Sequence, residues 1–577
     1  MSLEWWKKSV IYHIYLPSFK DDNDDGIGDF QGLIHELRYF KALRVSNLML
    51  SPFYPSSMKD NGYDITCFTD VDPMFGTMHD FHLFMLEAQE QDLNIIIDFV
   101  ANHTSDQHPW FIKSIDKEEP FTDFYIWVDA KPDSTAEEPV PPNNWLSVFG
   151  GSAWTWNEQR KQFYYHQFLP EQPDLNYRNP AVRREMEKVL KFWLDKGVDG
   201  FRIDAASHIF EDERLLDEPR AKQTKATMDE YGYLNHMYTK GMPETYELLK
   251  EWRHILDDYS KRLDKPKIMI IEGMEDIEDV IHYYGTIHEK IAEIPMNFQF
   301  YKVTPTSTGI NVQEIIDAWL KNMPMGKFPN YVISSHDFPR VASRVDSILA
   351  SSLQMVILLL PGIPIFYYGD ELGMENGVIS PEEMKDSFAL RTKPSNSRDP
   401  MRTPMQWNSD ENAGFTNCDK PWLPINSNYR NQNVEVQMGD VFSFLENFKR
   451  LVKLRREPSM LLGTFEYALV DEDIFSFTRS IVGAKCYLII VNMNENAVSV
   501  NLTDKVPSLP ETACLILTNP CYYEKLLSSR NVLSNYNESS SSSHTQNFIH
   551  PAENQISIAL NNLNLESHQG MVLSYEI

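Results

Sequence analysis

The feature that most constrains the fold is the alternation of short, strongly apolar runs with longer amphipathic stretches through most of the chain before residue 450. Runs such as 94–100 and 268–271 are apolar at successive positions rather than at every second one. Continuous apolarity is typical of parallel strands that are buried on both faces. Between the runs, stretches such as 183–196 and 244–263 place apolar residues at helical spacing. The alternation predicts an α/β fold, a (β/α)8 TIM barrel, whose functional groups gather at the carboxyl ends of the strands.

Two irregular segments interrupt this alternation, and a different pattern follows it. The segment 104–175 is too long for an ordinary loop and predicts an inserted subdomain after the third strand. From about residue 465, short alternating runs predict a C-terminal all-β domain. The expected organisation is a catalytic barrel over 1–103 and 176–464 with an irregular insertion near 375–437, the inserted subdomain 104–175, and a C-terminal β-sandwich domain over 465–577. The barrel strands are expected at 10–17, 47–52, 94–100, 200–204, 267–272, 297–301, 331–335 and 363–368.

Charge and hydropathy narrow the classes of partner. The chain has 577 residues with 53 basic and 83 acidic side chains, a formal net charge of −30, and 42% hydrophobic residues. Such a chain can bury a large core, and its negative charge repels phosphate backbones and anionic lipid, so no nucleic-acid partner is expected. The longest apolar stretch, 355–368, is broken by Pro361, Gly362 and Pro364. We therefore expect no transmembrane segment.

Cysteines and the start of the chain say little about the compartment. Five scattered cysteines predict neither a disulfide framework nor a zinc site, since no CxxC pair is present. No hydrophobic signal core follows Met1. The location therefore stays open: secreted if a leader was trimmed, otherwise cytoplasmic.

Three of the expected strands end in acidic residues. Asp204 closes the run 200–204 two residues after Arg202, so both side chains point to one side of the strand. The adjacent guanidinium favours the ionised form of Asp204, which a nucleophile requires. Glu272 emerges from an apolar strand, where partial desolvation favours the protonated form of a general acid. With Asp337 after the run 331–335, the chain supplies the paired carboxyl groups that glycoside hydrolysis requires.

These residues lie in motifs that occur in a fixed order. They are Asp98–His103 (DFVANH), Gly200–Asp204 (GFRID), Ile271–Met274 (IEGM) and Ser335–Asp337 (SHD), flanked by 28–29, 60–64 and 402–407. Through them the chain resembles the α-amylase superfamily (glycoside hydrolase family 13), and within it the insect maltases and oligo-1,6-glucosidases. The resemblance covers essentially the whole chain. Gly273 and Met274 depart from the small-aromatic pair common after the acid, which concerns the leaving-group side.

The resemblance implies specific roles. Asp204 would be the nucleophile, Glu272 the general acid/base, and Asp337 the carboxylate that holds the 2- and 3-hydroxyls of the sugar. Asp60 and Arg402 would close the pocket behind a non-reducing glucose, which favours removal of one terminal glucose. The remaining substrate-binding residues would be Tyr63, His103, Gln167, Arg202 and His336. The implied enzyme is a retaining, exo-acting α-glucosidase that acts on small neutral oligosaccharides such as sucrose and maltose.

A cation site and two alternative functions complete the expectations. Oxygen-bearing residues alternate in the loop Asp21, Asn23, Asp25, Ile27 and Asp29, as in a calcium-binding loop, which predicts a structural Ca²⁺ or Mg²⁺. One alternative function is a sugar isomerase or transglucosylase on the same scaffold. The other is a non-catalytic homologue like the heavy chain of an amino-acid transporter. The preference among sucrose, maltose and isomaltose, and the oligomeric state, stay open.

Overall fold

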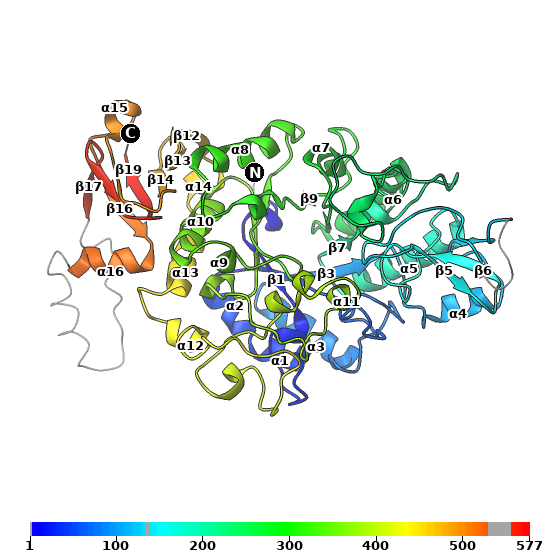
Figure 1. The fold of residues 1–577 in the computed structure, drawn as a ribbon. Helices are drawn as coiled ribbons and strands as arrows, with labels where there is room; N and C mark the ends of the chain where they lie inside the picture. Colours follow the sequence, from blue (N-terminus) through cyan, green and yellow to red (C-terminus); the bar gives the residue numbers. More distant parts are fainter. Residues whose placement is uncertain (1–2, 133–138, 529–555, 577) are drawn as a thin grey trace.

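A parallel β-barrel forms the centre of the computed structural model, which describes residues 3–132, 139–528 and 556–576 (Figure 1). Its sheet has the strand order β10-β11-β1-β2-β3-β7-β8-β9, and every pairing in it is parallel. The predicted barrel fold is therefore confirmed. The strands are β1 (Ile11–Ile14), β2 (Asn47–Leu50), β3 (Asn94–Val100), β7 (Gly200–Asp204), β8 (Ile268–Ile271), β9 (Ile294–Pro295), β10 (Asn330–Val332) and β11 (Ile363–Tyr367).

The apolar runs became strands because both of their faces are covered. All seven residues of β3 and all four of β8 are buried. The sixth strand was predicted wrongly at 297–301. The structure places it earlier, at β9, where Ile294 and Met296 enter the barrel core. Residues Gln299–Lys302 form a 3-10 helix instead, and the Asn297 side chain accepts a hydrogen bond from the Gln299 N–H at its start.

One side chain closes the barrel between β9 and β10, the two ends of the sheet. The Asn330 side chain donates to the Pro295 carbonyl at 2.5 Å and accepts from the Asn297 N–H at 2.8 Å. A single backbone bond, from Val332 N–H to Asn297 O at 3.0 Å, adds to this seam. The amide of Asn330 thus replaces part of the strand ladder.

Amphipathic helices surround the strands. Helix α5 buries Val182, Met186, Leu190 and Trp193 on one face, and the Asn179 side chain caps its first turn by accepting from Ala181 N–H. The main helices of this layer are α3 (Met78–Glu90), α5 (Pro180–Asp195), α6 (Pro243–Leu263), α8 (Gly309–Asn322), α10 (Ser347–Leu359) and α13 (Phe444–Leu454). Among the described residues, no helix combines the length and apolar character needed to cross a membrane.

The segment 104–175 carries a small sheet of its own. Strands β4 (Trp127–Val128), β6 (Gln162–Tyr165) and β5 (Trp154–Asn157) pair antiparallel in that order. Trp145 and Trp154 stack with ring centroids 5.8 Å apart in a separate apolar cluster. In Figure 1 this sheet lies at the opposite end of the molecule from the C-terminal strands. The exact domain boundaries remain predictions.

The C-terminal part of the chain forms an antiparallel sheet that packs on the barrel helix α10. Its strands follow the order β12-β13-β14-β19-β16-β17, so β19 (Gly570–Tyr575) lies between β14 (Cys486–Asn492) and β16 (Thr512–Thr518). The remaining three are β12 (Thr464–Val470), β13 (Ile474–Ser480) and β17 (Ser557–Ala559), and β15 (Val498–Val500) pairs with β18 (Leu563–Leu565). Gly570 touches α10 closely, since a Cβ there would lie 2.9 Å from Ser352 Oγ. The segment 529–555 of the predicted domain lies outside the described residues.

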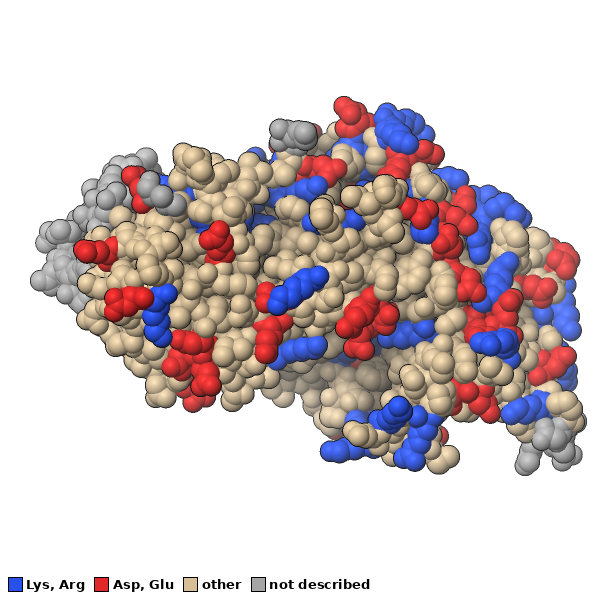
Figure 2. All heavy atoms as spheres, turned by 90° about the horizontal axis from the view of Figure 1, so that it is seen from above, with Lys and Arg blue, Asp and Glu red and all other residues tan. Residues whose placement is uncertain are grey.

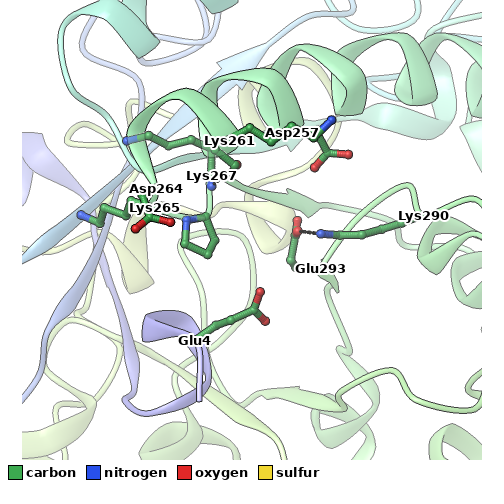
Figure 3. A pocket seen from close by; sticks show the side chains of 10 residues that line it. Glu4, Asp257, Lys261, Asp264, Lys265, Lys267, Lys290 and Glu293 are labelled. Atoms are coloured by element: carbon green, nitrogen blue, oxygen red, sulfur yellow. Dashed lines mark hydrogen bonds and ion pairs between the residues drawn. The ribbon is translucent and has the colours of Figure 1, made fainter. Parts of the chain in front are cut away.

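Ion pairs close the end of the barrel at which the strands begin. Figure 3 shows a hollow there, lined by side chains of the segment 257–267 together with Glu4, Lys290 and Glu293. Buried Lys267 donates to Asp199 at 2.9 Å, and buried Arg253 pairs with Glu293 at 2.9 Å. These charges are satisfied by one another, as a structural role requires. On the face drawn in Figure 2, acidic and basic side chains are interspersed.

Candidate active site

Four acidic side chains meet at the carboxyl end of the barrel. Asp98 lies in β3, Asp204 ends β7, Glu272 follows β8, and Asp337 lies in the loop after β10. The strands β3, β7 and β8 are parallel neighbours, so their carboxyl ends open on one side. The three carboxylates expected to be catalytic are therefore brought to one mouth of the barrel.

Arg202 connects three of these carboxyl groups. Its Nη1 lies 2.6 Å from both oxygens of Asp98 and 3.0 Å from Oδ1 of Asp204. Its Nη2 lies 2.8 Å from Oε1 of Glu272. The guanidinium is almost completely buried. Asp204 and Glu272 therefore lie on the two nitrogens of one guanidinium group.

One positive charge cannot neutralise three buried carboxyl groups. Burial, and then the Glu272 carboxylate, raise the pKa of Asp204 well above its usual value, although Arg202 lowers it. Burial likewise raises the pKa of Asp98 to about 6. Arg202, which was expected to hold Asp204 ionised, contacts it but divides its charge among three carboxyl groups.

Local backbone geometry fixes the position of Glu272. Its Oε2 accepts a hydrogen bond from the Ala205 N–H at 3.1 Å. Ala205 adopts a left-handed conformation, with φ 47° and ψ 35°, directly after Asp204. A non-glycine residue in this region is strained, and such strain is concentrated at functional sites. The turn aims the N–H of Ala205 at the second carboxylate.

Two arginines and a histidine hold Asp337. Its Oδ1 pairs with Arg402 Nη2 at 2.9 Å and with Arg398 Nη1 at 3.2 Å, while Oδ2 lies 3.1 Å from His336 Nε2. Burial opposes ionisation of Asp337, but His336, Arg398 and Arg402 outweigh it and hold the pKa below the usual range. Asp337 is therefore the permanently ionised carboxylate of the site.

The charged closure expected from Asp60 and Arg402 has a different composition. Asp60 Oδ1 pairs with Arg398 Nη2 at 3.0 Å, and Arg402 pairs with Asp337 instead. Arg398 therefore stands between the two expected partners, and it also pairs with fully buried Asp386 at 2.7 Å. Burial raises the pKa of Asp60 to about 6, although Arg398 and Arg402 lower it.

The expected aromatic and histidine residues line the same region. The Tyr63 ring stacks on His336 at 5.6 Å, and its hydroxyl lies 2.7 Å from His336 Nε2 and 3.1 Å from Asp98 Oδ2. His103 Nε2 lies 3.1 Å from the Tyr63 carbonyl. Gln167 is buried and donates to Asp174 Oδ2 at 3.0 Å, so Asp174 positions it.

Sequence reasoning missed Arg398, Gln172 and Asp174. The amide of Gln172 donates to Asp60 Oδ2 at 3.1 Å, and the same nitrogen lies 3.0 Å from His103 Nε2. Gln172 therefore joins Asp60 to His103, two of the residues expected to bind substrate. Its signal in the sequence is weak, since Gln172–Pro173–Asp174 lies in a segment without regular periodicity.

The acidic loop before α1 (Phe30–His35) is folded on its own side chains. Asp21 accepts from the N–H groups of Asp24 and Gly26, and Asp29 caps α1 by accepting from Gly32 N–H at 2.7 Å. Asp21 and Asp29 are buried, and neither has a lysine or arginine ion partner in the described part of the chain. The charge of Asp21 adds to burial in raising the pKa of Asp29, so a cation would relieve both groups.

The carboxylates of the loop do not by themselves form a metal-coordinating site. Within the described residues, no three His, Cys, Asp or Glu side chains converge in a geometry that would hold a metal. A bound cation would therefore need Asn23 and the carbonyl of Ile27 in addition to the aspartates, which fits the oxygen-rich coordination of Ca²⁺.

Comparison with known proteins gives a consistent result over the whole chain. Residues 13–463 match the family model described as alpha amylase, catalytic domain. Maltase 1 of Drosophila virilis is 40% identical over 528 residues, which cover 90% of this chain and 83% of that protein. The amino acid transporter heavy chain SLC3A1 of Mus musculus is 38% identical, over 88% of this chain and 73% of its own length.

A solved structure agrees with these relatives. The crystal structure of the alpha-glucosyl transfer enzyme XgtA superposes with a TM-score of 0.83 at 28% identity, covering 100% of both chains. The likeness therefore includes the inserted segment and the C-terminal sheet as well as the barrel.

Proposed function

Because the chain belongs to the alpha-amylase family of glycoside hydrolases, we propose that it is a retaining, exo-acting α-glucosidase. Its substrates are small neutral oligosaccharides with a terminal α-glucose, such as maltose and sucrose. The observation that carries the proposal is the single guanidinium of Arg202, which holds Asp204 and Glu272 side by side at 3.0 and 2.8 Å.

The chemistry follows from the charges of the site. Asp204 attacks the anomeric carbon while Glu272 delivers a proton to the departing glycosidic oxygen, and a glucosyl ester of Asp204 forms. Glu272, now ionised, then takes a proton from water, which attacks the same carbon and releases α-glucose. Asp337, ionised throughout, holds the sugar hydroxyls as positive charge develops on the ring.

The closed end of the pocket accounts for exo action. Asp60, Arg398 and Asp337 form a chain of ion pairs behind the place of the reacting glucose, and Asp60 is 5% exposed. A longer glucan would have to break this buried chain to pass through, which costs several kcal/mol. Cleavage at the terminal residue is therefore favoured over cleavage within a polymer.

Two of the similar proteins suggest alternative functions for this chain. One alternative is alpha-glucosyl transfer, the activity after which XgtA is named, which would use the same glucosyl ester with another acceptor in place of water. The other alternative is a role like that of the amino acid transporter heavy chain, which would not need the carboxylates. The arrangement of Asp204, Glu272 and Asp337 around two arginines favours catalysis over this second alternative.

The proposal is tested by assaying the purified chain on an aryl α-glucoside, maltose, sucrose, isomaltose and trehalose. NMR identifies the anomer that is released first, and retention requires the α-anomer. Asp204→Asn should lose at least about a thousandfold in kcat/KM, as loss of a nucleophile typically does. Asp258→Asn, which changes an exposed carboxylate on α6, is the control. Turnover by Asp204→Asn near that of the control would overturn the proposal, and recovery of a rearranged disaccharide would favour an isomerase.

We also propose that the loop 21–29 binds a structural Ca²⁺ or Mg²⁺. The support is the buried, unneutralised pair Asp21 and Asp29 together with the alternating oxygens of Asn23, Asp25 and the Ile27 carbonyl. The loop contacts the irregular insertion near 375–437, because the backbone N–H of Trp422 donates to Gly26 O at 3.0 Å. A cation there would stabilise this contact and take no part in the reaction.

A further inference from the structure

Asp386 is a completely buried carboxylate beside Arg398, and the proposed mechanism gives it no role. Nε of Arg398 lies 3.1 and 3.2 Å from its two oxygens, and Nη2 lies 2.7 Å from Oδ1. Oδ2 also accepts from the backbone N–H of Arg398 at 2.7 Å. Asp386 therefore binds both the side chain and the main chain of one arginine. Contacts of this bidentate kind fix the direction of a guanidinium as well as its position.

The other contacts of the same guanidinium reach two walls of the pocket. Nη2 of Arg398 donates to Oδ1 of Asp60 at 3.0 Å, and Nη1 donates to Oδ1 of Asp337 at 3.2 Å. Asp60 lies on the loop that follows β2, and Asp337 lies on the loop that follows β10. A guanidinium is planar and rigid, so a rotation away from Asp386 would break at least one of these two contacts. The bridge between the two walls therefore depends on how Asp386 holds the arginine.

Two phenylalanine rings pack on this guanidinium. Its Cζ lies 5.3 Å from the ring centre of Phe149, in the inserted segment, and 5.9 Å from that of Phe388. The two ring centres are 5.1 Å apart. Phe388 lies in the first turn of α11 (Ser387–Arg391), and Asp386 caps this helix by accepting from the Phe388 N–H at 3.2 Å. One carboxylate thus positions the cation and also begins the helix that carries one of the two rings.

The backbone around Asp386 is fixed to its surroundings as well. The Oγ of Ser387 donates to the carbonyl of Lys59, the residue directly before Asp60. Oδ2 of Asp399 accepts from the Asp386 N–H at 3.0 Å. The segment that contains Asp386 is therefore attached both to the loop of Asp60 and to the residue after Arg398, so its carboxylate has little freedom to move with the arginine.

Asp386 and Asp60 differ in how firmly they keep a negative charge. Burial opposes the ionisation of Asp386, but Arg398 and then Arg402 outweigh it, and the pKa of Asp386 lies below its usual value. For Asp60 the effect of burial prevails, and its pKa is raised to about 6. Asp386 is therefore a constant anionic partner of Arg398, whereas Asp60 becomes neutral in mildly acidic solution.

We propose that Asp386 is a positioning residue for substrate binding, which holds Arg398 in the orientation that joins Asp60 to Asp337. The inference rests on the proposed glucosidase function, because this closed end of the pocket lies behind the reacting glucose. The effect of Asp386 on the sugar passes through Arg398. Asp337 also pairs with Arg402 at 2.9 Å, a contact that does not involve Asp386. Binding of the terminal glucose should therefore depend on Asp386 more strongly than the chemical step does.

A double-mutant cycle distinguishes positioning of Arg398 from a general contribution of Asp386 to folding. The values of kcat and KM for an aryl α-glucoside are measured for the wild type, Asp386→Asn, Arg398→Met and the double variant. Asparagine keeps the size of the side chain and can still cap α11, but it lacks the charge. Glu382→Gln, which changes an exposed carboxylate of the same insertion, is the matched control. Thermal unfolding establishes that each variant is folded before it is assayed.

We expect Asp386→Asn to raise KM about tenfold, the size expected when hydrogen bonds to a charged group are lost, and to change kcat by less than about threefold. The double variant should have the KM of Arg398→Met, because no arginine is left to position, and the control should keep the wild-type KM. An unchanged KM in Asp386→Asn, or effects that multiply in the double variant, would overturn the inference and leave the glucosidase function in place. If Asp386→Asn does not fold, Asp386→Ser, which also caps a helix, allows the same comparison. Absence of turnover by the wild-type chain would overturn both the inference and the proposed function.

Discussion

Replacing Arg398 with alanine should destabilise the protein and weaken its closed pocket, in a way that depends on pH. Arg398 contacts Asp60, Asp337 and Asp386 at 3.0, 3.2 and 2.7 Å. Removing one partner of a buried ion pair costs about 3–5 kcal/mol, because the other charge stays buried. The pKa of Asp60 is about 6 even with Arg398 present, so protonating Asp60 at pH 7 costs only about 1.4 kcal/mol. At low pH, protonation therefore neutralises Asp60 and removes the cost of its unpaired buried charge.

The expected result is a loss of about 3–5 kcal/mol in the free energy of unfolding at pH 8 and a smaller loss at pH 5. Denaturant unfolding at the two pH values measures it, and KM for maltose reports the pocket. Arg398→Lys keeps the charge but cannot reach three carboxylates at once, so its loss should be intermediate. Arg391→Ala is the control, because among the described residues Arg391 makes one long hydrogen bond, of 3.4 Å, with the Gly150 carbonyl. A loss for Arg398→Ala within about 0.5 kcal/mol of the control at pH 8 would refute the reasoning.

Two further predictions concern stability. Glu371 is fully buried, accepts from the hydroxyls of Tyr12 and Tyr39 at 2.7 Å each, and burial raises its pKa from 4.5 to about 7. The stability that protonated Glu371 contributes is full below pH 4.5 and is lost as the pH rises to about 7. Between pH 4.5 and 8 the free energy of unfolding of the wild type should therefore fall by about 3 kcal/mol more than that of Glu371→Gln. Parallel pH dependences of the free energy of unfolding for the two proteins would contradict this. The second prediction concerns the proposed cation site. Added CaCl2 should raise Tm and a chelator should lower it, whereas Asp21→Asn should abolish this shift without changing kcat. Equal Tm values of the wild type with and without Ca²⁺ would rule out the proposed site.

The barrel was predictable because its strands are buried on both faces and thus apolar at every position. β3 and β8 show this most clearly. β9 is the exception, since its ladder has only two residues and Asn330 replaces the missing bonds. A side chain that stands in for a strand ladder leaves no periodic signal in the sequence. The aromatic residues Phe298 and Phe300 next to it suggested a strand where the chain forms a 3-10 turn.

The catalytic carboxylates were predictable because each follows an apolar run directly. The ion-pair partners were not, because they come together only in the folded chain: Asp60 and Arg398 are separated by 338 positions. Two arginines lie four residues apart in this segment, and sequence alone could not decide which one faces Asp60. Likewise, the sharing of Arg202 by three carboxyl groups becomes apparent only when Asp98 is placed beside β7.

The position of β19 affects how this chain is made by the ribosome. β14 and β16 each pair with β19 and flank it on either side, although β19 comes last in sequence order. During synthesis β14 and β16 therefore each have one unpaired strand edge until residues 570–575 leave the ribosomal exit tunnel. Open edges pair readily with other chains. Polypeptides interrupted before residue 570 should therefore aggregate through this sheet, even when their barrel has already formed.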